Sequence, residues 1–312
     1  FNALPAGVSP DFTSRQYYQM PNQIMCDTLY QNFNTRHWGT QLFGLDAGYG
    51  CCTANYHQGW PKFTRQLWLA APDNGLALLT YAPSEVSALV ADHVPVHFTE
   101  ETTYPFDETI TLRFSSARDI AFPLSLRIPS WCEQPSVMVN GRAAEMEGRG
   151  AVRTIARTWH DGDSVTIRFP MQVRISKWHE ESAGIERGPL VFALKMREAW
   201  QKVKGTEPYI TSTIHSTDPW NYGLLIGNEA FPDSSFRAVR LEPASLQPFS
   251  PEGAPLALHV KAKRIPEWQR YNGVAGPMPW SPIRSKEKAE DVTLIPYGCT
   301  KLRIAEFPLI EE

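Results

Sequence analysis

Hydrophobic and polar residues alternate over short stretches through most of the chain after residue 68. The segments ETITLRFSS (108–116), FPLSLRIPSWC (122–132) and SVMVNGR (136–142) place apolar side chains at every second position. This alternation predicts half-buried β-strands, and the Gly, Pro, Asp and Asn residues between the segments predict turns. Short strands with regular turns are typical of an antiparallel β-sandwich.

A second block with the same pattern begins after residue 171. It contains GIERGPLVFALK (184–195), APLALHVKAKRIPEW (254–268) and TLIPYGCTKLRIAEFP (293–308). We therefore predict two β-sandwich domains, a middle one at 68–171 and a C-terminal one at 172–312. Tight turns are expected at Asn140–Arg142 (NGR) and Asp161–Asp163 (DGD), because these residues tolerate left-handed backbone.

Residues 1–67 have a different composition, rich in Gln, Asn and aromatic residues. A helix is predicted from Pro61 onward, since proline is favoured at the first helical position. Its core-facing residues would recur every three or four positions: Trp60, Phe63, Leu67 and Ala70. This prediction places Cys51 and Cys52 in the loop before a helix start, where a thiolate is stabilised by the helix dipole.

Length and charge limit the classes of function. A chain of 312 residues is long enough for two or three domains. The formal net charge of −3 provides no basic field for nucleic acid and no polybasic face for a membrane surface. No apolar run reaches the length of a bilayer. From the charge we expect no nucleic-acid partner, and from the charge and the apolar runs together we expect no membrane partner.

The chain contains five cysteines: Cys26, Cys51, Cys52, Cys132 and Cys299. An odd, sparse set in a chain of this length does not indicate a disulfide framework. Adjacent cysteines rarely bond to each other, because the small ring strains the disulfide. Cys51 and Cys52 could instead pair with distant cysteines, bind a metal or supply a reactive thiolate. Cys132 and Cys299 lie in the β blocks and are expected in the core.

Several segments together resemble glycoside hydrolase family 127 and its β-L-arabinofuranosidase-like relatives. They run in order along nearly the whole chain: GCCTANYHQGWPKF (50–63), PLSLRIPSWCEQPSVMVNGR (123–142), TWHDGDSVTIRFPMQVR (158–174), GIERGPLVFALK (184–195) and LIPYGCTKLRIAEFP (294–308). The resemblance implies a mainly β chain: the end of an (α/α)6 catalytic barrel at 1–67, followed by two antiparallel β-sandwiches.

The resemblance also implies a role for the cysteine pair. Cys51 would be the nucleophile of a retaining glycosidase acting on plant-type carbohydrate, and Cys52 would be a zinc ligand. Most retaining glycosidases use a carboxylate as nucleophile, so a thioglycosyl intermediate would be an unusual variant. In the family, the general acid/base glutamate and the other zinc ligands lie upstream of the pair. We therefore expect the missing N-terminal barrel to belong to the same polypeptide, and this portion alone to be inactive and without zinc.

Further candidates for substrate binding are Tyr18, Asn22, Asn55 and His57. Tyr18 and Asn22 lie, with Tyr17, where the family has a loop near the sugar pocket. Asn55 and Gln58 could equally cap the following helix. His57 could form a catalytic pair with Cys51, although a structural hydrogen bond is the alternative. Cys26 is expected to be a buried thiol, with a third metal ligand as the alternative.

Two patterns in the β blocks have competing interpretations. Aromatic residues could stack on sugars, but sandwich cores also use them, and we expect a core role; they are Trp131, Trp159, Trp220 and Tyr222. Glu180 and Glu181 in WHEES form a carboxylate pair, but neighbours on a strand point to opposite faces, so a solvated edge is expected. The main alternative to an enzyme is a non-catalytic, carbohydrate-binding or scaffolding β-sandwich unit.

Overall fold

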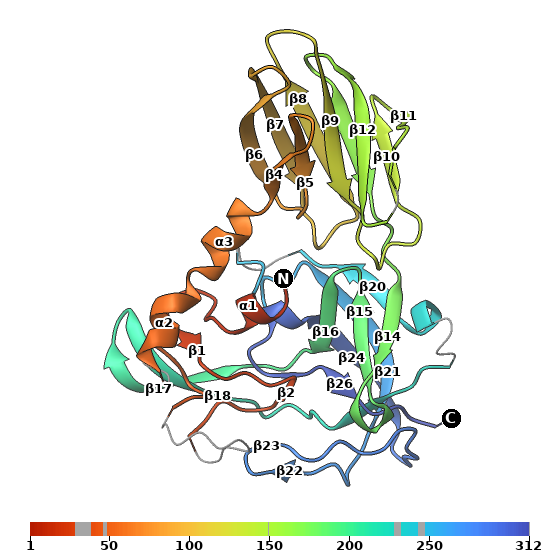
Figure 1. Ribbon diagram of the computed structural model, residues 1–312. Coiled ribbons are helices and arrows are strands. Elements are labelled where there is room, and N and C mark those ends of the chain that lie inside the picture. The colour runs from red at the N-terminus through yellow and green to blue at the C-terminus, as the bar shows by residue number, and fades with distance from the viewer. Residues whose placement is uncertain (29–38, 46–48, 149, 228–231, 243–246, 312) are drawn as a thin grey trace. The chain divides into compact units, whose positions relative to one another are not determined.

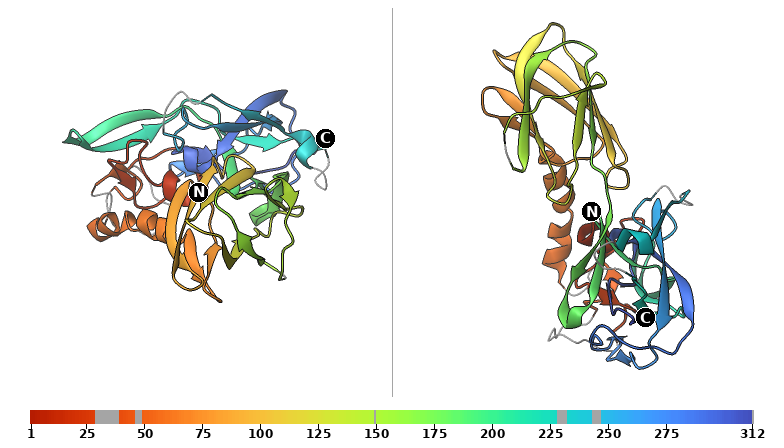
Figure 2. Two further views of the ribbon diagram at one scale, coloured as in Figure 1. Left: turned by 90° about the horizontal axis from the view of Figure 1, so that it is seen from above. Right: turned by 90° about the vertical axis from the view of Figure 1, so that its right-hand side faces the viewer.

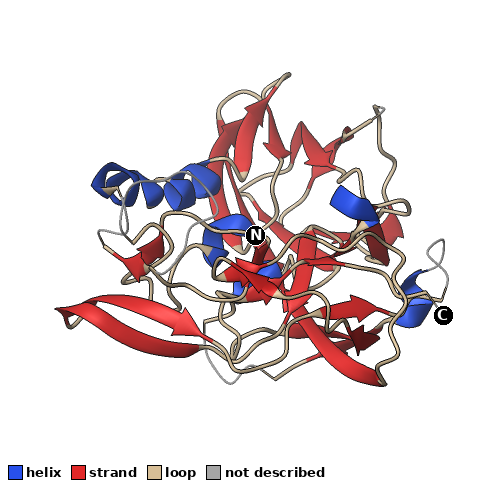
Figure 3. Ribbon diagram, turned by 90° about the horizontal axis from the view of Figure 1, so that it is seen from below, coloured by secondary structure: helices blue, strands red, loops and turns tan. Residues whose placement is uncertain are grey.

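The computed structural model describes residues 1–28, 39–45, 49–148, 150–227, 232–242 and 247–311. Strands predominate over short helices, so the fold is mainly β, as the sequence predicted (Figure 3). The chain divides into two compact units. One contains residues 58–171, and the other joins residues 1–57 to residues 172–312.

The unit at 58–171 consists of helix α3 (Gly59–Arg65) and two sheets (Figure 1). One sheet has the order β11–β10–β13–β8–β7–β6. Its strands are β6 (Ser84–Val90), β7 (Val94–Thr102), β8 (Thr109–Ser115), β10 (Ser136–Val139), β11 (Arg142–Ala143) and β13 (Ser164–Arg168). The other sheet has the order β12–β9–β5–β4. Its strands are β4 (Trp68–Ala71), β5 (Gly75–Leu78), β9 (Ile120–Arg127) and β12 (Val152–Trp159). The neighbours β5 and β9 pair parallel, whereas the sequence predicted antiparallel strands throughout.

An aromatic core joins the two sheets. Phe98 and Phe114 come from one sheet, and Phe122 and Trp159 come from the other. The ring centroids of Phe98 and Trp159 are 6.2 Å apart, and those of Phe114 and Phe122 are 6.0 Å apart. The indole N–H of Trp159 donates to the carbonyl oxygen of Phe122 at 3.1 Å. The core role expected for Trp159 is therefore confirmed, and the unit is a β-sandwich.

The two predicted tight turns are present, with different roles. Asn140 and Gly141 have φ of 50° and 76°, the left-handed conformation that a two-residue hairpin between β10 and β11 requires. Gly162, with φ of 84°, turns the chain from β12 to β13, which belong to different sheets. There the Asp163 carboxylate accepts hydrogen bonds from the backbone N–H of His160 at 2.9 Å and from the amide of Asn140 at 2.6 Å.

The other unit is built on a sheet of order β14–β15–β16–β24–β21–β19, with β26 paired to β15 and β20 paired to β21. Its strands are β14 (Val173–Lys177), β15 (Ala183–Arg187), β16 (Leu190–Leu194), β19 (Tyr222–Leu224), β20 (Arg237–Arg240), β21 (Leu256–Arg264), β24 (Ala289–Pro296) and β26 (Glu306–Phe307). Short 3-10 turns occur at His179–Glu181, Pro232–Ser235 and Tyr297–Cys299. A small ladder joins β22 (Arg270–Tyr271) to β23 (Val274–Ala275).

The N-terminal segment forms part of this unit. It contains α1 (Ala3–Ala6), β1 (Arg15–Gln16), β2 (Asn22–Gln23), β3 (Phe43–Gly44) and α2 (Gly50–Tyr56). Strands β1 and β3 extend the hairpin of β17 (Ala199–Thr206) and β18 (Tyr209–His215), which projects as a long arm in Figure 2. Strand β2 pairs with β25 (Arg303–Ile304). The sequence did not predict these pairings, because two-residue strands leave no alternation to detect.

Buried polar side chains fasten the N-terminal segment to the C-terminal strands. The Lys301 ammonium donates to the carbonyl oxygen of Pro5 at 2.8 Å, and the Arg303 guanidinium donates to that of Met20 at 3.0 Å. The Glu198 carboxylate accepts from the backbone N–H of Lys301 at 2.6 Å. Burial lowers the pKa of Lys301 to about 8, although Glu198 opposes that shift. Burial also raises the pKa of Glu198. Buried charges that hold backbone groups in this way make the two segments one folded body.

Three sequence predictions need correction. Helix α3 begins at Gly59 and ends at Arg65, so Pro61 is its third residue and Ala70 lies in strand β4, where it is exposed. Residues Trp68–Ala71 form strand β4 and pair with β5. The helix therefore ends before Ala70, the last residue that the apolar spacing assigned to it. Glu180 and Glu181 are not on a strand but in the turn between β14 and β15.

The predicted division at residues 171 and 172 coincides with a change of unit. The assignment of residues 1–67 to the end of a catalytic barrel stays a prediction. None of the described helices is long and apolar enough to cross a membrane.

Candidate functional site

Cys51 and Cys52 lie in the first turn of α2, not in the predicted loop. Cys51 is exposed and Cys52 is partly buried. Tyr49 precedes the helix in extended conformation and provides no side-chain cap. Because Gly50 and cysteine favour helices weakly and the usual capping residue is absent, the sequence carried no helix signal here.

A buried arginine, which the sequence analysis missed, holds this helix. Arg15 is 4% exposed, and its Nε donates to the Thr53 hydroxyl at 2.8 Å. One of its terminal amino groups donates to the carbonyl oxygen of Tyr49 at 2.7 Å. The Tyr56 hydroxyl also donates to the carbonyl oxygen of Leu4. Nothing in sequence spacing marks Arg15, since 34 residues separate it from Tyr49.

The two thiols are close but form no disulfide bond. Their sulfur atoms are 3.8 Å apart. Desolvation and the Cys51 thiol raise the pKa of Cys52, and the charge of Arg15 acts in the opposite direction. The Arg15 guanidinium also lies within electrostatic range of Cys51. A fixed cation beside a thiol favours the thiolate, which is the nucleophilic form.

The sulfur spacing fits two ligands of one zinc ion. Zinc–sulfur bonds of about 2.3 Å at a tetrahedral angle place two thiolates about 3.8 Å apart. Among the described residues, however, no group of three or more His, Cys, Asp and Glu could hold a metal. Zinc binding by Cys52 stays a prediction.

Cys26 lies elsewhere in the same unit. It is fully buried, and the amides of Gln16 and Gln23 donate to its sulfur at 3.5 Å and 3.2 Å. Burial raises the pKa of its thiol. The predicted buried thiol is confirmed, as it is for Cys132 and Cys299.

Of the predicted tyrosines, Tyr17 is the one whose ring lies beside α2. Its centroid is 4.7 Å from that of Tyr49, and the Arg15 guanidinium lies 5.7 Å from it. Tyr18 is 37% exposed, and its backbone N–H donates to the carbonyl oxygen of Thr40 at 2.9 Å. The role of Tyr18 in substrate binding stays a prediction.

Asn22 lies on β2 and its amide contacts backbone. Its side-chain oxygen accepts from the N–H groups of Ala305 and Glu306 at 3.0 Å and 3.1 Å. This arrangement holds the start of β26, so the Asn22 side chain has a structural role that requires no ligand. Its substrate-binding role stays untested.

Asn55 lies on the same short helix as the thiols, and His57 follows the last residue of that helix. The Asn55 amide donates to the carbonyl oxygen of Cys51 at 2.7 Å, one turn back. Gln58, at the N-cap position of α3, makes no side-chain cap there. His57 is exposed at the end of α2. Six residues of helix advance by about 9 Å, so the helix carries His57 away from Cys51 and supports no catalytic pair.

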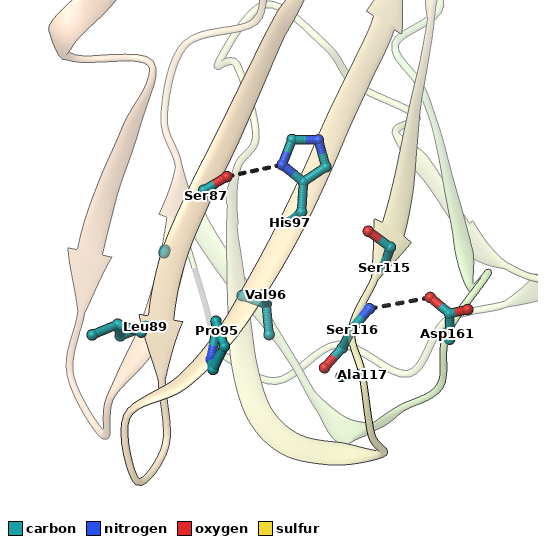
Figure 4. Close-up of a pocket in the computed structure, with 10 residues that line it drawn as sticks. Ser87, Leu89, Pro95, Val96, His97, Ser115, Ser116, Ala117 and Asp161 are labelled. Carbon is teal, nitrogen blue, oxygen red and sulfur yellow. Dashed lines mark hydrogen bonds between the residues drawn. The ribbon is translucent and has the colours of Figure 1, made fainter.

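A separate groove lies on the unit at 58–171, between the ends of β6, β7 and β8. Figure 4 shows Ser87 bonded to His97 and the backbone N–H of Ser116 bonded to Asp161. These distances are 3.0 Å and 3.1 Å. The groove has a volume of about 550 Å³, and its lining residues include no Phe, Tyr or Trp. In this groove the Ser87 hydroxyl lies beside the His97 imidazole, and the Asp161 carboxylate accepts from the Ser116 backbone.

Comparison with known proteins identifies one part of the chain directly. Residues 75–171 match the family model described as beta-L-arabinofuranosidase, GH127 middle domain. No curated protein matches the chain.

Solved structures share the fold over nearly the whole chain. A GH127 beta-L-arabinofuranosidase from Geobacillus stearothermophilus T6 is 20% identical, with 99% of this chain and 44% of that chain covered and a TM-score of 0.63. A protein described as a glycoside hydrolase is 21% identical, with coverage of 99% and 47% and a TM-score of 0.66. A GH127 beta-arabinofuranosidase is 18% identical, with coverage of 98% and 43% and a TM-score of 0.67.

The chain thus spans less than half of the length of each of these structures. The resemblance to glycoside hydrolase family 127 is confirmed by these matches.

Proposed function

We propose that the polypeptide containing these residues is a retaining glycoside hydrolase of the β-L-arabinofuranosidase type, with Cys51 as its nucleophile. The observation that carries the proposal is an exposed Cys51 thiol on a helix held by buried Arg15, in a chain whose residues 75–171 match the GH127 middle domain. The proposed substrate class is arabinose-containing carbohydrate, and the names of the similar proteins support this choice.

The reaction follows double displacement. The Cys51 sulfur attacks the anomeric carbon, a sulfur–carbon bond forms, and the glycosidic carbon–oxygen bond breaks. An acid group gives the leaving oxygen its proton. Water then attacks the same carbon and gives a proton to the conjugate base of that acid group. The sulfur–carbon bond breaks, and the thiolate is restored. Two inversions give a product with the anomeric configuration of the substrate.

The described residues contribute orientation and charge to this reaction. Arg15 holds both ends of the first turn of α2 through Thr53 and Tyr49. Its guanidinium lies within electrostatic range of both thiols. The ring of Tyr49, the residue before that turn, packs against the ring of Tyr17. The acid/base residue is proposed to lie in the part of the fold that this chain does not span.

The stereochemistry of hydrolysis tests this proposal. The intact polypeptide is expected to hydrolyse an aryl β-L-arabinofuranoside and to release β-L-arabinofuranose first, as followed by proton NMR before mutarotation. Release of the inverted anomer would contradict a covalent Cys51 intermediate. Sugar binding without hydrolysis would favour the alternative, a non-catalytic carbohydrate-binding unit.

We also propose that Cys52 is a zinc ligand in the intact polypeptide. A bound zinc ion would keep the coordinating thiol deprotonated at neutral pH. Elemental analysis is expected to find about one zinc per intact molecule, and less than about a tenth of that in Cys52→Ser. The matched control is Cys132→Ser, which changes a buried thiol in the other unit and is expected to keep its zinc. Equal zinc in Cys52→Ser and the unchanged protein would remove Cys52 from the site.

A further inference from the structure

A row of three residues crosses the sheet where β14, β15 and β26 lie side by side. Ser176 is opposite Gly184, and Gly184 is opposite Glu306. Opposed residues of antiparallel strands project to the same face, with Cβ positions roughly 5 Å apart. Ser176, Gly184 and Glu306 therefore share one face, and the glycine leaves a depression between two polar side chains.

The indole of Trp178 occupies this depression. Its N–H donates to the Ser176 hydroxyl at 2.8 Å, and its backbone N–H donates to the carbonyl oxygen of Ser182 at 2.9 Å. A Cβ atom at position 184 would lie only 2.9 Å from the indole nitrogen, so the ring needs glycine there. Trp178 is nevertheless 59% exposed. The ring is thus held in place from below while it stays open to solvent.

Two acidic residues come close to Trp178 in the fold: Glu180 lies in the turn that follows it, and Glu306 is opposite Gly184 on β26. Glu180 and Glu181 have φ of 56° and 55°, a left-handed conformation that is uncommon in non-glycine residues and costs energy. The backbone carbonyl oxygen of Glu180 accepts from the N–H of Ser281 at 2.9 Å. The His179 ring lies 3.4 Å from the Glu180 carboxylate. Burial raises the pKa of Glu306, and nearby His179 acts against that shift.

We propose that Trp178, Glu180 and Glu306 form a saccharide-binding subsite on the β14–β15 turn. An exposed indole that is already ordered offers a flat apolar face for the C–H groups of a sugar at little entropic cost. The carboxylates accept hydrogen bonds from sugar hydroxyl groups and fix the orientation.

The choice of an arabinose-containing oligosaccharide as ligand rests on the proposed function, whereas the geometry of the subsite does not. Figure 1 shows the β14–β15 turn and α2 apart within the same unit. We infer that the subsite holds a branch or a neighbouring part of the polysaccharide while another part is cleaved.

Titration calorimetry with an arabinose-containing trisaccharide tests the subsite. The intact polypeptide is used with Cys51→Ala, so that cleavage does not interfere. Trp178→Ala is expected to weaken binding at least tenfold, and Gly184→Ala is expected to weaken it several-fold by displacing the ring. The matched control is Tyr209→Ala, which removes an equally exposed aromatic residue (59%) from β18 and is expected to leave the affinity unchanged.

Each result decides the question. Loss of affinity in both Trp178→Ala and Gly184→Ala, with Tyr209→Ala unaffected, supports the subsite even if the unchanged protein hydrolyses nothing. Equal affinity in Trp178→Ala and its parent overturns it, even if hydrolysis proceeds with retention. A shift from dimer to monomer in Trp178→Ala, measured by sedimentation, would assign this face to protein association and overturn the subsite as well.

Discussion

Replacing Cys51 with serine is expected to lower kcat for hydrolysis of an aryl β-L-arabinofuranoside by at least about 10³-fold. A serine hydroxyl does not ionise near neutral pH, and the charge of Arg15 is too weak to ionise it. KM is expected to change little, because the substitution removes one atom type without altering the shape of the site. Cys51 is exposed, so the free energy of unfolding should change by less than about 0.5 kcal/mol.

Ala54→Ser is the matched control for this variant. Ala54 is exposed on the same helix, and the substitution introduces the same hydroxyl group. It is expected to keep kcat within about twofold of the unchanged protein. If Cys51→Ser kept more than a tenth of the original kcat, Cys51 would not be the nucleophile.

Replacing Trp159 with alanine is expected to lower the free energy of unfolding of the sandwich at residues 58–171 by about 3–5 kcal/mol. Trp159 is fully buried, and its ring centroid lies 5.9 Å from that of Phe114 and 5.8 Å from that of Phe122. The smaller side chain leaves a cavity between the sheets. It also leaves the carbonyl oxygen of Phe122 without the indole donor, which adds to the cost.

Differential scanning calorimetry of the intact polypeptide measures this effect as a shift of the transition that belongs to this unit. Val152→Ala is the matched control, because Val152 lies on the same strand and is 43% exposed. It is expected to change stability by less than about 0.5 kcal/mol. A loss below about 1 kcal/mol in Trp159→Ala would mean that the aromatic cluster does not hold the two sheets together.

The strands of the sandwich at 58–171 were predictable because each has one buried face. The alternation at Ile110, Leu112 and Phe114 corresponds to buried positions on β8, and the turn at Asn140 and Gly141 has the conformation that the residue types favour. The parallel pairing of β5 with β9 was not predictable. A strand pattern records which face is buried and not which neighbour lies beside it.

Three features around the candidate site and the β14–β15 turn were not predictable from the sequence. The cysteine pair was evident as a motif, but its place on a helix was not, because Tyr49 and Gly50 give no cap signal. Arg15 was missed because its importance comes from a contact with residues far along the chain. The β14–β15 turn was read as a strand, since the left-handed backbone of Glu180 and Glu181 is one that sequence patterns do not predict for glutamate.

Peptide mapping after covalent capture is the most direct test of the central claim, that Cys51 is the nucleophile of a glycosidase. The intact polypeptide is treated with an L-arabinofuranose analogue that carries an electrophile at the anomeric position, and the labelled peptide is sequenced by mass spectrometry. We expect one label per chain, on Cys51. Excess substrate is expected to block the labelling, and Cys51→Ala is expected to abolish it. A label on Cys52 or on a carboxylate, or no label in a protein that hydrolyses the substrate, would contradict it.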